Sequence, residues 1–219
     1  EKPHVGRNIH AFRTVQSTND VAAAQAEHGA FEWTIVVADQ QTKGRGRLGR
    51  TWYSPPGTGI YLSIVLRPTF PSEDAPGLSL MTALALAETL EKLCPGGIQI
   101  KWPNDVLLGG RKVAGILTEL SAEKEKISHV IVGVGINVNH GVGHFPADIK
   151  DRATSVRRYL KHKISRIQLL QEFLHQFEHR LVDNNVGLCV QEQASLLADG
   201  FDNLRMAVAG IGHTDAAGE

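Results

Sequence analysis

Residues 98–138 read IQIKWPNDVLLGGRKVAGILTELSAEKEKISHVIVGVGINV and contain four apolar runs separated by polar or glycine-rich breaks. The runs fall at residues 98–102, 106–108, 113–120 and 127–138, and their many β-branched residues are typical of strands. Gly109 and Gly110 lie between the second and third runs, where they favour a tight hairpin turn because such turns need positive φ. We therefore expect a set of neighbouring strands that is largely antiparallel.

The segments on either side of this stretch predict further strands and several helices. Residues 9–15, 33–38 and 60–67 are expected to be strands, the last of them alternating along its length. Ser17 and Asp20 resemble a capping box that opens an Ala-rich helix ending near Gly29. Helical spacing over residues 77–93 predicts a helix that covers the sheet, and an amphipathic helix follows from Ser165 to about residue 184, with another at 190–197. The predicted fold class is α+β, a mixed and largely antiparallel β-sheet backed by helices.

The composition is that of an ordinary folded domain. The 219 residues include 23 basic and 23 acidic side chains, so the formal charge is zero and a polyanion-coating role is disfavoured. The longest apolar runs are too short to cross a bilayer, so no membrane partner is expected. Only two cysteines occur, Cys94 and Cys189, too few for a disulfide framework. With no secretory signal visible before the first strand, we expect a reducing, cytoplasmic location.

The strongest local motif is the loop GRGRLGR at residues 44–50. Glycine lets the backbone approach an anion, and arginine offers a fixed fork of donors. Between residues 40 and 72 there are five basic residues and no acidic one, which predicts a local anion site. A flexible solvated loop and an RNA-contacting segment are the alternatives. The apolar strands predicted on both sides favour a small-molecule site on a rigid scaffold.

Two further clusters follow it in the sequence. The first combines the segments KWPND (101–105) and RKVAGI (111–116). Lys112 begins a predicted strand that contains Gly115, and a glycine in a strand permits close approach of a ligand such as a phosphate. Ordinary surface lysines on a hairpin are the alternative. In GVGINVN, residues 133–139, alternate glycines clear one strand face for a flat group such as a purine, or else mark a bend in the sheet. These residues alone do not choose between the two.

Two histidine pairs have a four-residue spacing that could hold a metal ion, His140 with His144 and His175 with His179. The first pair lies in a glycine-rich loop, and the second has no obvious third ligand. We expect solvated histidines and no metal site.

Read together and in order, five segments resemble biotin protein ligases: STN (17–19), QTKGRGR (41–47), KWPND (101–105), KVAGI (112–116) and GVGIN (133–137). The resemblance implies a catalytic domain over residues 1–199 whose fold is similar to that of class II aminoacyl-tRNA synthetases. A short tail at 200–219 stands where relatives usually continue into a small β-barrel domain. Because no helix-turn-helix domain precedes the first residue, a ligase without DNA as a partner is expected.

The reaction that the resemblance implies has two steps. Biotin and MgATP give biotinyl-5′-AMP and pyrophosphate, and the acyl group then passes to a lysine of a biotin carboxyl carrier protein or domain of a biotin-dependent carboxylase. ATP and Mg²⁺ enter as substrate and activator and biotin as substrate, with no tightly bound prosthetic group. The oligomeric state, a homodimer included, stays open.

The resemblance also implies roles for particular residues. Those expected to neutralise the meeting anions or to prepare the acceptor amine are Arg45, Arg47, Lys112 and Asp105. The expected biotin contacts are Ser17, Thr18, Asn19, Gln41, Gly44, Arg45, Arg47, Lys112 and Gly115. The expected nucleotide contacts are Arg47, Arg50, Trp52, Lys112 and Asn137. The glycine-rich loop has hinges enough to close over the ligand and shield a reactive anhydride from water.

Two alternatives accompany this reading. A biotin-binding truncated ligase with weak or no turnover is one, because the barrel domain helps to cover ATP in relatives. A lipoate or octanoate ligase relative is the other, although the chain lacks that family's Arg-Arg followed by a Gly-Gly-Gly run and a matching cysteine nucleophile.

Overall fold

The computed structural model describes residues 8–123 and 126–183. Within these residues the strands form one sheet in the order β1-β2-β3-β7-β6-β5-β4. Neighbouring strands are antiparallel except β1 and β2, which run parallel, so the predicted mixed, largely antiparallel sheet is confirmed. The strands are β1 (Asn8–Val15), β2 (Thr34–Gln41), β3 (Gly59–Leu66), β4 (Ile98–Lys101), β5 (Asp105–Leu108), β6 (Arg111–Glu123) and β7 (Lys126–Asn137).

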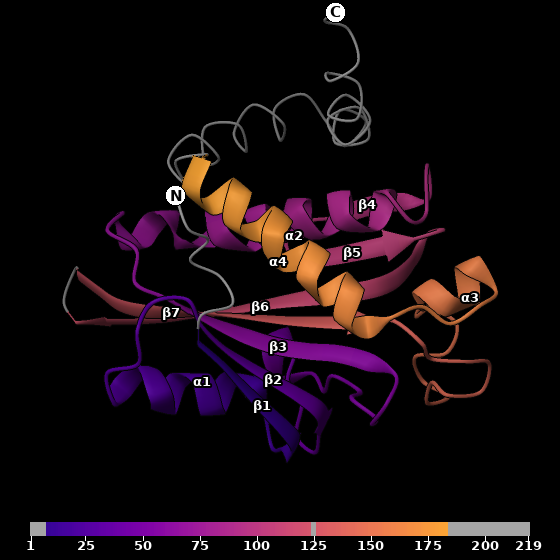
Figure 1. The fold of residues 1–219 in the computed structure, drawn as a ribbon, viewed down its shortest axis with the longest axis horizontal. Helices are drawn as coiled ribbons and strands as arrows, with labels where there is room; N and C mark the ends of the chain where they lie inside the picture. Colours follow the sequence, from indigo (N-terminus) through magenta and orange to yellow (C-terminus); the bar gives the residue numbers. More distant parts are fainter. Residues whose placement is uncertain (1–7, 124–125, 184–219) are drawn as a thin grey trace, which may run out of the picture.

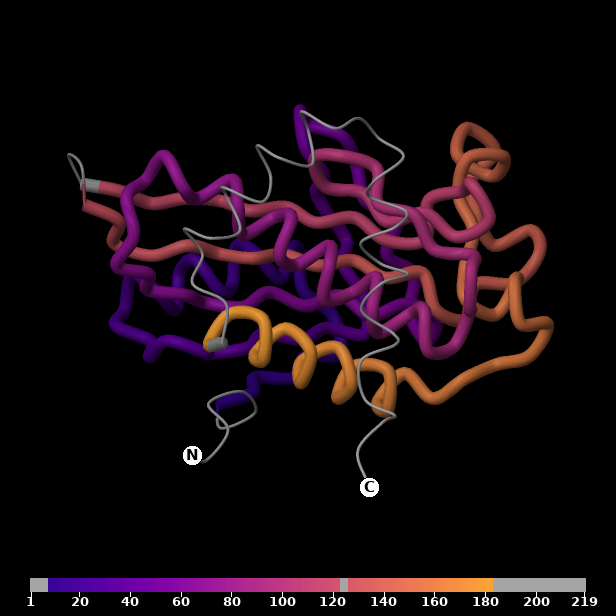
Figure 2. The backbone as a smooth tube through the Cα atoms, turned by 90° about the horizontal axis from the view of Figure 1, so that it is seen from above, coloured from indigo at the N-terminus to yellow at the C-terminus, as the bar shows by residue number. Residues whose placement is uncertain are grey.

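Helices cover both faces of this sheet (Figure 1). On one face α2 (Ala75–Glu91) and α4 (Arg166–Asp183) pack against each other, and on the other face lies α1 (Thr18–Glu27). The short helix α3 (Val156–Leu160) lies at one end of the sheet, and 3₁₀ turns span Arg47–Gly49 and Ser72–Asp74. In the view from above, β6 and β7 run side by side along the length of the molecule (Figure 2).

The apolar core is divided by the sheet into two clusters. The larger one joins the sheet to α2 and α4, and the smaller one joins it to α1 through Ala22, Ala26, Val36, Val65 and Ile131. Because both faces are covered, every residue of β3 is buried. The side chains of residues 60–67 therefore do not alternate between buried and exposed as predicted, since those on both faces of the strand pack against helices.

The turns and helix starts confirm most local predictions and correct one. Gly109 and Gly110 have φ of 58° and 74°, as the predicted hairpin turn requires. Ser17 precedes α1 with extended backbone, but its side chain makes no capping hydrogen bond, so the predicted capping box is wrong. Asp20 pairs with Arg45 instead, because a full guanidinium charge attracts the carboxylate more strongly than a backbone N–H does.

The start of α4 agrees with the sequence, since Ser165 Oγ accepts a hydrogen bond from the Gln168 backbone at 3.3 Å. The helix predicted at 190–197 and the tail at 200–219 lie outside the described residues. Across residues 8–123 and 126–183, no helix combines the length and the apolar character that a membrane crossing requires.

Candidate active site

A cavity of about 640 Å³ opens beside α1 and under the loop that joins β2 to β3. This volume lies within the range of small-molecule sites. The cavity is lined by residues from every segment that the sequence singled out: Ser17, Thr18, Asn19, Gln41, Arg45, Arg47, Arg50, Trp52, Asp105, Lys112, Gly115 and Asn137. Gly44 alone among the predicted site residues does not line it.

Gly44 instead lies where the loop packs on itself. A Cβ at this position would lie 2.6 Å from the Trp52 carbonyl oxygen and 2.7 Å from Ser54 Oγ. Any larger residue would displace the part of the loop that carries Trp52. The role of Gly44 in this structure is therefore close packing beneath the site.

The end of the cavity next to α1 is built from buried hydroxyl and amide groups. Gln41 Oε1 accepts hydrogen bonds from the Thr18 backbone N–H at 2.8 Å and from Thr18 Oγ1 at 3.0 Å. Gln41 Nε2 donates to Ser54 Oγ at 2.9 Å. Ser17 is 3% exposed and, because it does not cap the helix, its hydroxyl can serve a ligand. This end therefore offers hydrogen bonds in a nearly dry setting.

The floor of the cavity is a row of glycines on the α1 face of the sheet. Gly115 of β6 is paired with Gly135 of β7, and the indole of Trp52 lies on both. A Cβ at Gly135 would lie 2.4 Å from Trp52 Nε1, and one at Gly133 would lie 2.1 Å from Asn19 Oδ1. The alternate glycines thus do clear one strand face, and the flat group against that face is the protein's own indole.

The Trp52 indole also carries a polar atom whose hydrogen-bonding capacity is unused. Its Nε1 is buried and has no hydrogen-bond partner among the described residues. A buried N–H without an acceptor costs free energy. An acceptor atom on a bound ligand would relieve that cost.

A bulge between β5 and β6 brings Lys112 onto the same face. Asp105 pairs with Gly115, but Leu107 pairs with Lys112, so β6 contains one residue more than β5 over this interval. Residues three apart on a regular strand point to opposite faces, and a bulge re-aims the side chain. As a result Lys112 Nζ lies 2.6 Å from Asp105 Oδ1 and 5.2 Å from the Trp52 ring centroid.

The arginines of the loop differ in their partners. Arg45 forms ion pairs with Asp20 and with Glu119, the latter at 2.9 Å. Burial lowers the pKa of Arg45, whereas the hydrogen bond to Asp20 and the charge of Glu119 raise it. The net effect is a raised pKa. Arg47 donates to the neutral Asn104 amide oxygen at 3.2 Å and, among the described residues, has no carboxylate partner.

A wall of the cavity comes from residues that the sequence reasoning missed, chiefly Phe145, Ile149 and Arg152. This segment is joined to the start of β6, because the Lys112 N–H donates to the Arg152 carbonyl at 2.8 Å and the Thr154 N–H donates to the Lys112 carbonyl at 2.9 Å. Its irregular sequence gives no periodic signal that could have placed it here. Asn137, which is 4% exposed, reaches the cavity from the end of β7.

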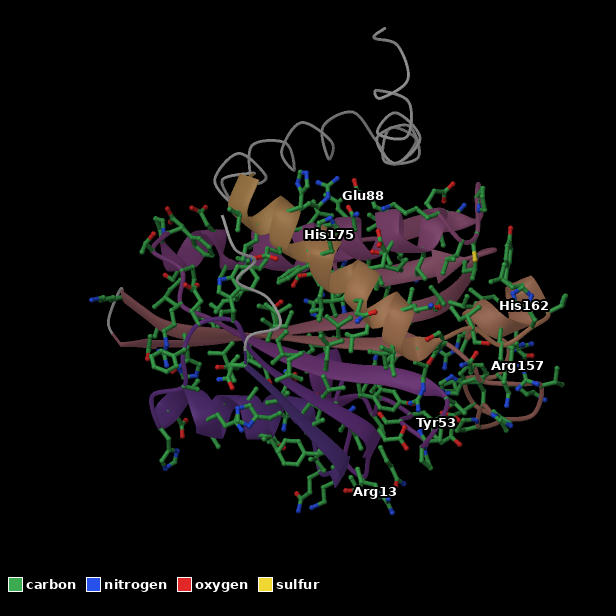
Figure 3. The ribbon with its side chains drawn as sticks, in the orientation of Figure 1. Arg13, Tyr53, Glu88, Arg157, His162 and His175 are labelled. Carbon is green, nitrogen blue, oxygen red and sulfur yellow. The ribbon has the colours of Figure 1, made fainter. Side chains whose placement is uncertain are left out.

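The prediction of solvated histidines is wrong for His140. His144, His175 and His179 are exposed, His175 on α4 as labelled in Figure 3, but His140 is fully buried and its ring stacks on Phe145 with centroids 4.9 Å apart. The aromatic neighbour and the surrounding chain exclude water, and burial together with His144 lowers the pKa of His140 to about 4. The described residues contain no group of three or more His, Cys, Asp or Glu side chains that could hold a metal ion.

Comparisons with known proteins agree with this geometry. A family model described as the biotin/lipoate A/B protein ligase family matches residues 11–137. The chain is 41% identical over 179 residues to the bifunctional ligase/repressor BirA of Bacillus subtilis, covering 82% of this chain and 55% of that protein. It is 33% identical over 181 residues to the biotin–[acetyl-CoA-carboxylase] ligase of Mycobacterium tuberculosis, covering 80% of this chain and 65% of the relative.

Among solved structures, the biotin protein ligase from Aquifex aeolicus in complex with biotin and ATP is similar with a TM-score of 0.69 and 36% identity. That match covers 82% of this chain and 74% of the Aquifex chain. The chain spans about half the length of the curated relatives it matches first. On the family match over residues 11–137 and the shared fold, the chain belongs to the biotin/lipoate A/B protein ligase family.

Proposed function

We propose that this chain is the catalytic domain of an ATP-dependent biotin protein ligase. In the first step the biotin carboxylate oxygen attacks the α-phosphorus of MgATP, the bond to the β-phosphate breaks, and biotinyl-5′-AMP and pyrophosphate form. In the second step the neutral ε-amine of a carrier lysine attacks the acyl carbon, AMP leaves, and the amine proton is lost. The partner is a carrier protein or domain of a biotin-dependent carboxylase.

The observation that carries the proposal is the position of Lys112. Its ammonium group lies on the glycine floor, between the Asp105 carboxylate and the face of Trp52. From there it can reach an anion placed on the floor. The relatives support the choice of substrates, because one is named as a biotin–[acetyl-CoA-carboxylase] ligase and a similar structure holds biotin and ATP.

The chemistry of the first step calls for such cations. Attack of a carboxylate on a polyphosphate brings two anions together, so positive groups fixed in advance lower the barrier. Lys112 and Arg47 are suited to this work, since Arg47 has only a neutral partner in the described chain. Mg²⁺ enters with ATP as part of the substrate and adds to the same neutralisation.

The two ends of the cavity suit the two halves of the intermediate. The ureido group of biotin needs hydrogen bonds where it is buried. The buried Ser17 hydroxyl can provide one, and Thr18 Oγ1, which donates to Gln41, can still accept one. Trp52 offers an aromatic face and a free N–H next to the nucleotide, and Asn137 offers an amide for the adenine.

In the second step Asp105 has two possible uses. It is 2.6 Å from Lys112 Nζ, so it can fix the ammonium group, and it can also accept the proton from the acceptor amine. The ion pair favours the orienting use, because the Asp105 carboxylate is already engaged by the Lys112 ammonium group. Asp105→Asn separates the two uses.

The test is ATP-dependent pyrophosphate release with biotin, lipoate or octanoate as the acyl substrate. The proposal expects release with biotin and little with the other two. Release with lipoate or octanoate alone would move the chain to that branch of the family. Biotin binding without pyrophosphate release would identify a biotin-binding protein that lacks turnover.

A further inference from the structure

The two arginines at the start of the glycine-rich loop do different things in this structure. The loop, residues 42–58, crosses the cavity with Arg45, Arg47 and Trp52. Arg45 Nη1 binds Asp20 Oδ1, while Nη2 contacts Glu119 Oε1 at 2.9 Å and Oε2 at 3.1 Å. Neither carboxylate belongs to the lining of the cavity. The guanidinium therefore links the loop to α1 and to β6, beside the cavity.

Glu119 is itself held in place from below. Its Oε2 accepts a hydrogen bond from Asn19 Nδ2 at 2.6 Å, and Asn19 Oδ1 accepts one from Ser63 Oγ at 2.6 Å. Asn19 in turn lies directly over Gly133, whose missing side chain makes room for it. These contacts connect Ser63 of β3 to Asn19 of α1, and Asn19 to Glu119 of β6. The side chain that meets Arg45 is therefore held in position by the sheet and by α1.

The two carboxylates beside Arg45 make it poorly suited to bind a substrate anion. Two carboxylates already balance its one positive charge, and the substrate would have to displace them. Arg47 bears the same charge and has a neutral amide as its partner, so it can meet an anion without breaking an ion pair.

We propose that Arg45, Asp20 and Glu119 form a clasp that holds loop 42–58 closed over the cavity, and that Arg45 is a positioning residue that leaves the substrate anions to Arg47 and Lys112. The closed loop keeps an activated acyl-adenylate from water and from escape. This second consequence rests on the proposed function, whereas the clasp itself does not.

The clasp predicts how the loop opens when one carboxylate is neutralised. Once released from its ion pairs, a glycine-rich loop also loses its own order. Hydrogen–deuterium exchange therefore reports opening through two hydrogen bonds inside the loop, from the Gly46 N–H to the Arg50 carbonyl at 2.7 Å and from the Trp52 N–H to the Gly44 carbonyl at 2.9 Å. In Glu119→Gln and in Asp20→Asn, peptides covering residues 44–52 should exchange about two- to fivefold faster, which corresponds to about 0.4–1 kcal/mol for ion pairs this exposed. Glu119→Asp keeps the charge and should restore part of the protection.

A matched control exists on the other side of the sheet. Glu172 pairs with Lys92 at 2.5 Å, and its side chain is 41% exposed against 40% for Glu119. Glu172→Gln removes the same charge from the α2–α4 layer. It should leave exchange of residues 44–52 unchanged. The melting temperature of each variant shows whether any effect comes from general loss of stability.

The outcomes separate the clasp from the proposed function. Unchanged loop exchange in both Glu119→Gln and Asp20→Asn overturns the clasp. Faster loop exchange together with about two- to fivefold faster release of the bound acyl-adenylate supports both parts. If no acyl substrate gives pyrophosphate even with the parent chain, the proposed function fails, and the exchange data still decide the clasp. Arg45→Gln abolishing pyrophosphate release while loop exchange stays at the parent rate would return Arg45 to the reacting groups and overturn its positioning role.

Discussion

Replacing Gly135 by alanine tests how Trp52 rests on the sheet. The new Cβ would lie 2.4 Å from Nε1 and 2.5 Å from Cε2 of the indole, closer than such atoms can approach. Either the indole or the strand must move, and overpacking of this kind costs about 1–3 kcal/mol. Alanine also stabilises the folded state by about 0.4–1 kcal/mol relative to glycine, because it restricts the unfolded chain. We expect a net loss of roughly 0.5–2 kcal/mol in the free energy of unfolding.

Thermal unfolding followed by circular dichroism measures this loss, and for a domain of this size the melting temperature should fall by about 1–8 °C. Gly46→Ala is the matched control, because a Cβ there meets its nearest neighbour at 3.5 Å, an ordinary contact. It should change the free energy of unfolding by less than about 0.5 kcal/mol. In a Trp52→Ala background the clash disappears, so Gly135→Ala should cost less than it does in the parent.

If Gly135→Ala melts at or above the parent temperature, or if it costs as much in the Trp52→Ala background, the indole does not lie on Gly135. The arrangement of the Trp52 end of the cavity would then be wrong.

Three further predictions concern Lys112, Asp105 and His140. Lys112→Ala should slow biotin-dependent pyrophosphate release by about 100- to 1,000-fold, the usual cost of losing one preorganised group that stabilises transition-state charge, and an unchanged rate would remove Lys112 from the chemistry. Asp105→Asn should slow adenylate formation and transfer to the carrier by similar factors if it orients Lys112; a loss confined to transfer, seen in single-turnover assays, would make it the base. Because burial lowers the pKa of His140 to about 4, the unfolded state binds the extra proton between about pH 6.5 and pH 4, so stability falls as the pH falls through that window, by up to about 1.4 kcal/mol per pH unit. Urea unfolding at pH 7 and pH 5 should show a smaller difference for His140→Gln than for the parent, and an equal difference would contradict the burial argument.

The sequence predicted the sheet well because its strands are joined by local signals. Gly109 and Gly110 specify the turn between β5 and β6, and the apolar runs are long enough to mark β6 and β7. It did not predict that β1 runs parallel to β2, since that pairing depends on α1 crossing between them. It also missed α3, whose five residues are too few to show a helical period.

The site could be predicted as a set of residues but not as an arrangement. Arg45 and Arg47 look alike in the motif, and only the fold brings Asp20 and Glu119 to the first of them. The bulge that turns Lys112 toward Gly115 leaves no mark in the sequence, because it arises from the mismatch in length between two paired strands. Phe145 and Arg152 were missed for a similar reason, since long-range pairing with β6 places them.

Mass-spectrometric detection of biotinyl-5′-AMP, after incubation of the chain with biotin and MgATP, tests the proposed ligase activity without a carrier protein. The parent chain should give the acyl-adenylate, and Lys112→Ala should give far less of it. Absence of the adenylate with the parent chain, under conditions in which biotin binds, would contradict the proposed ligase activity.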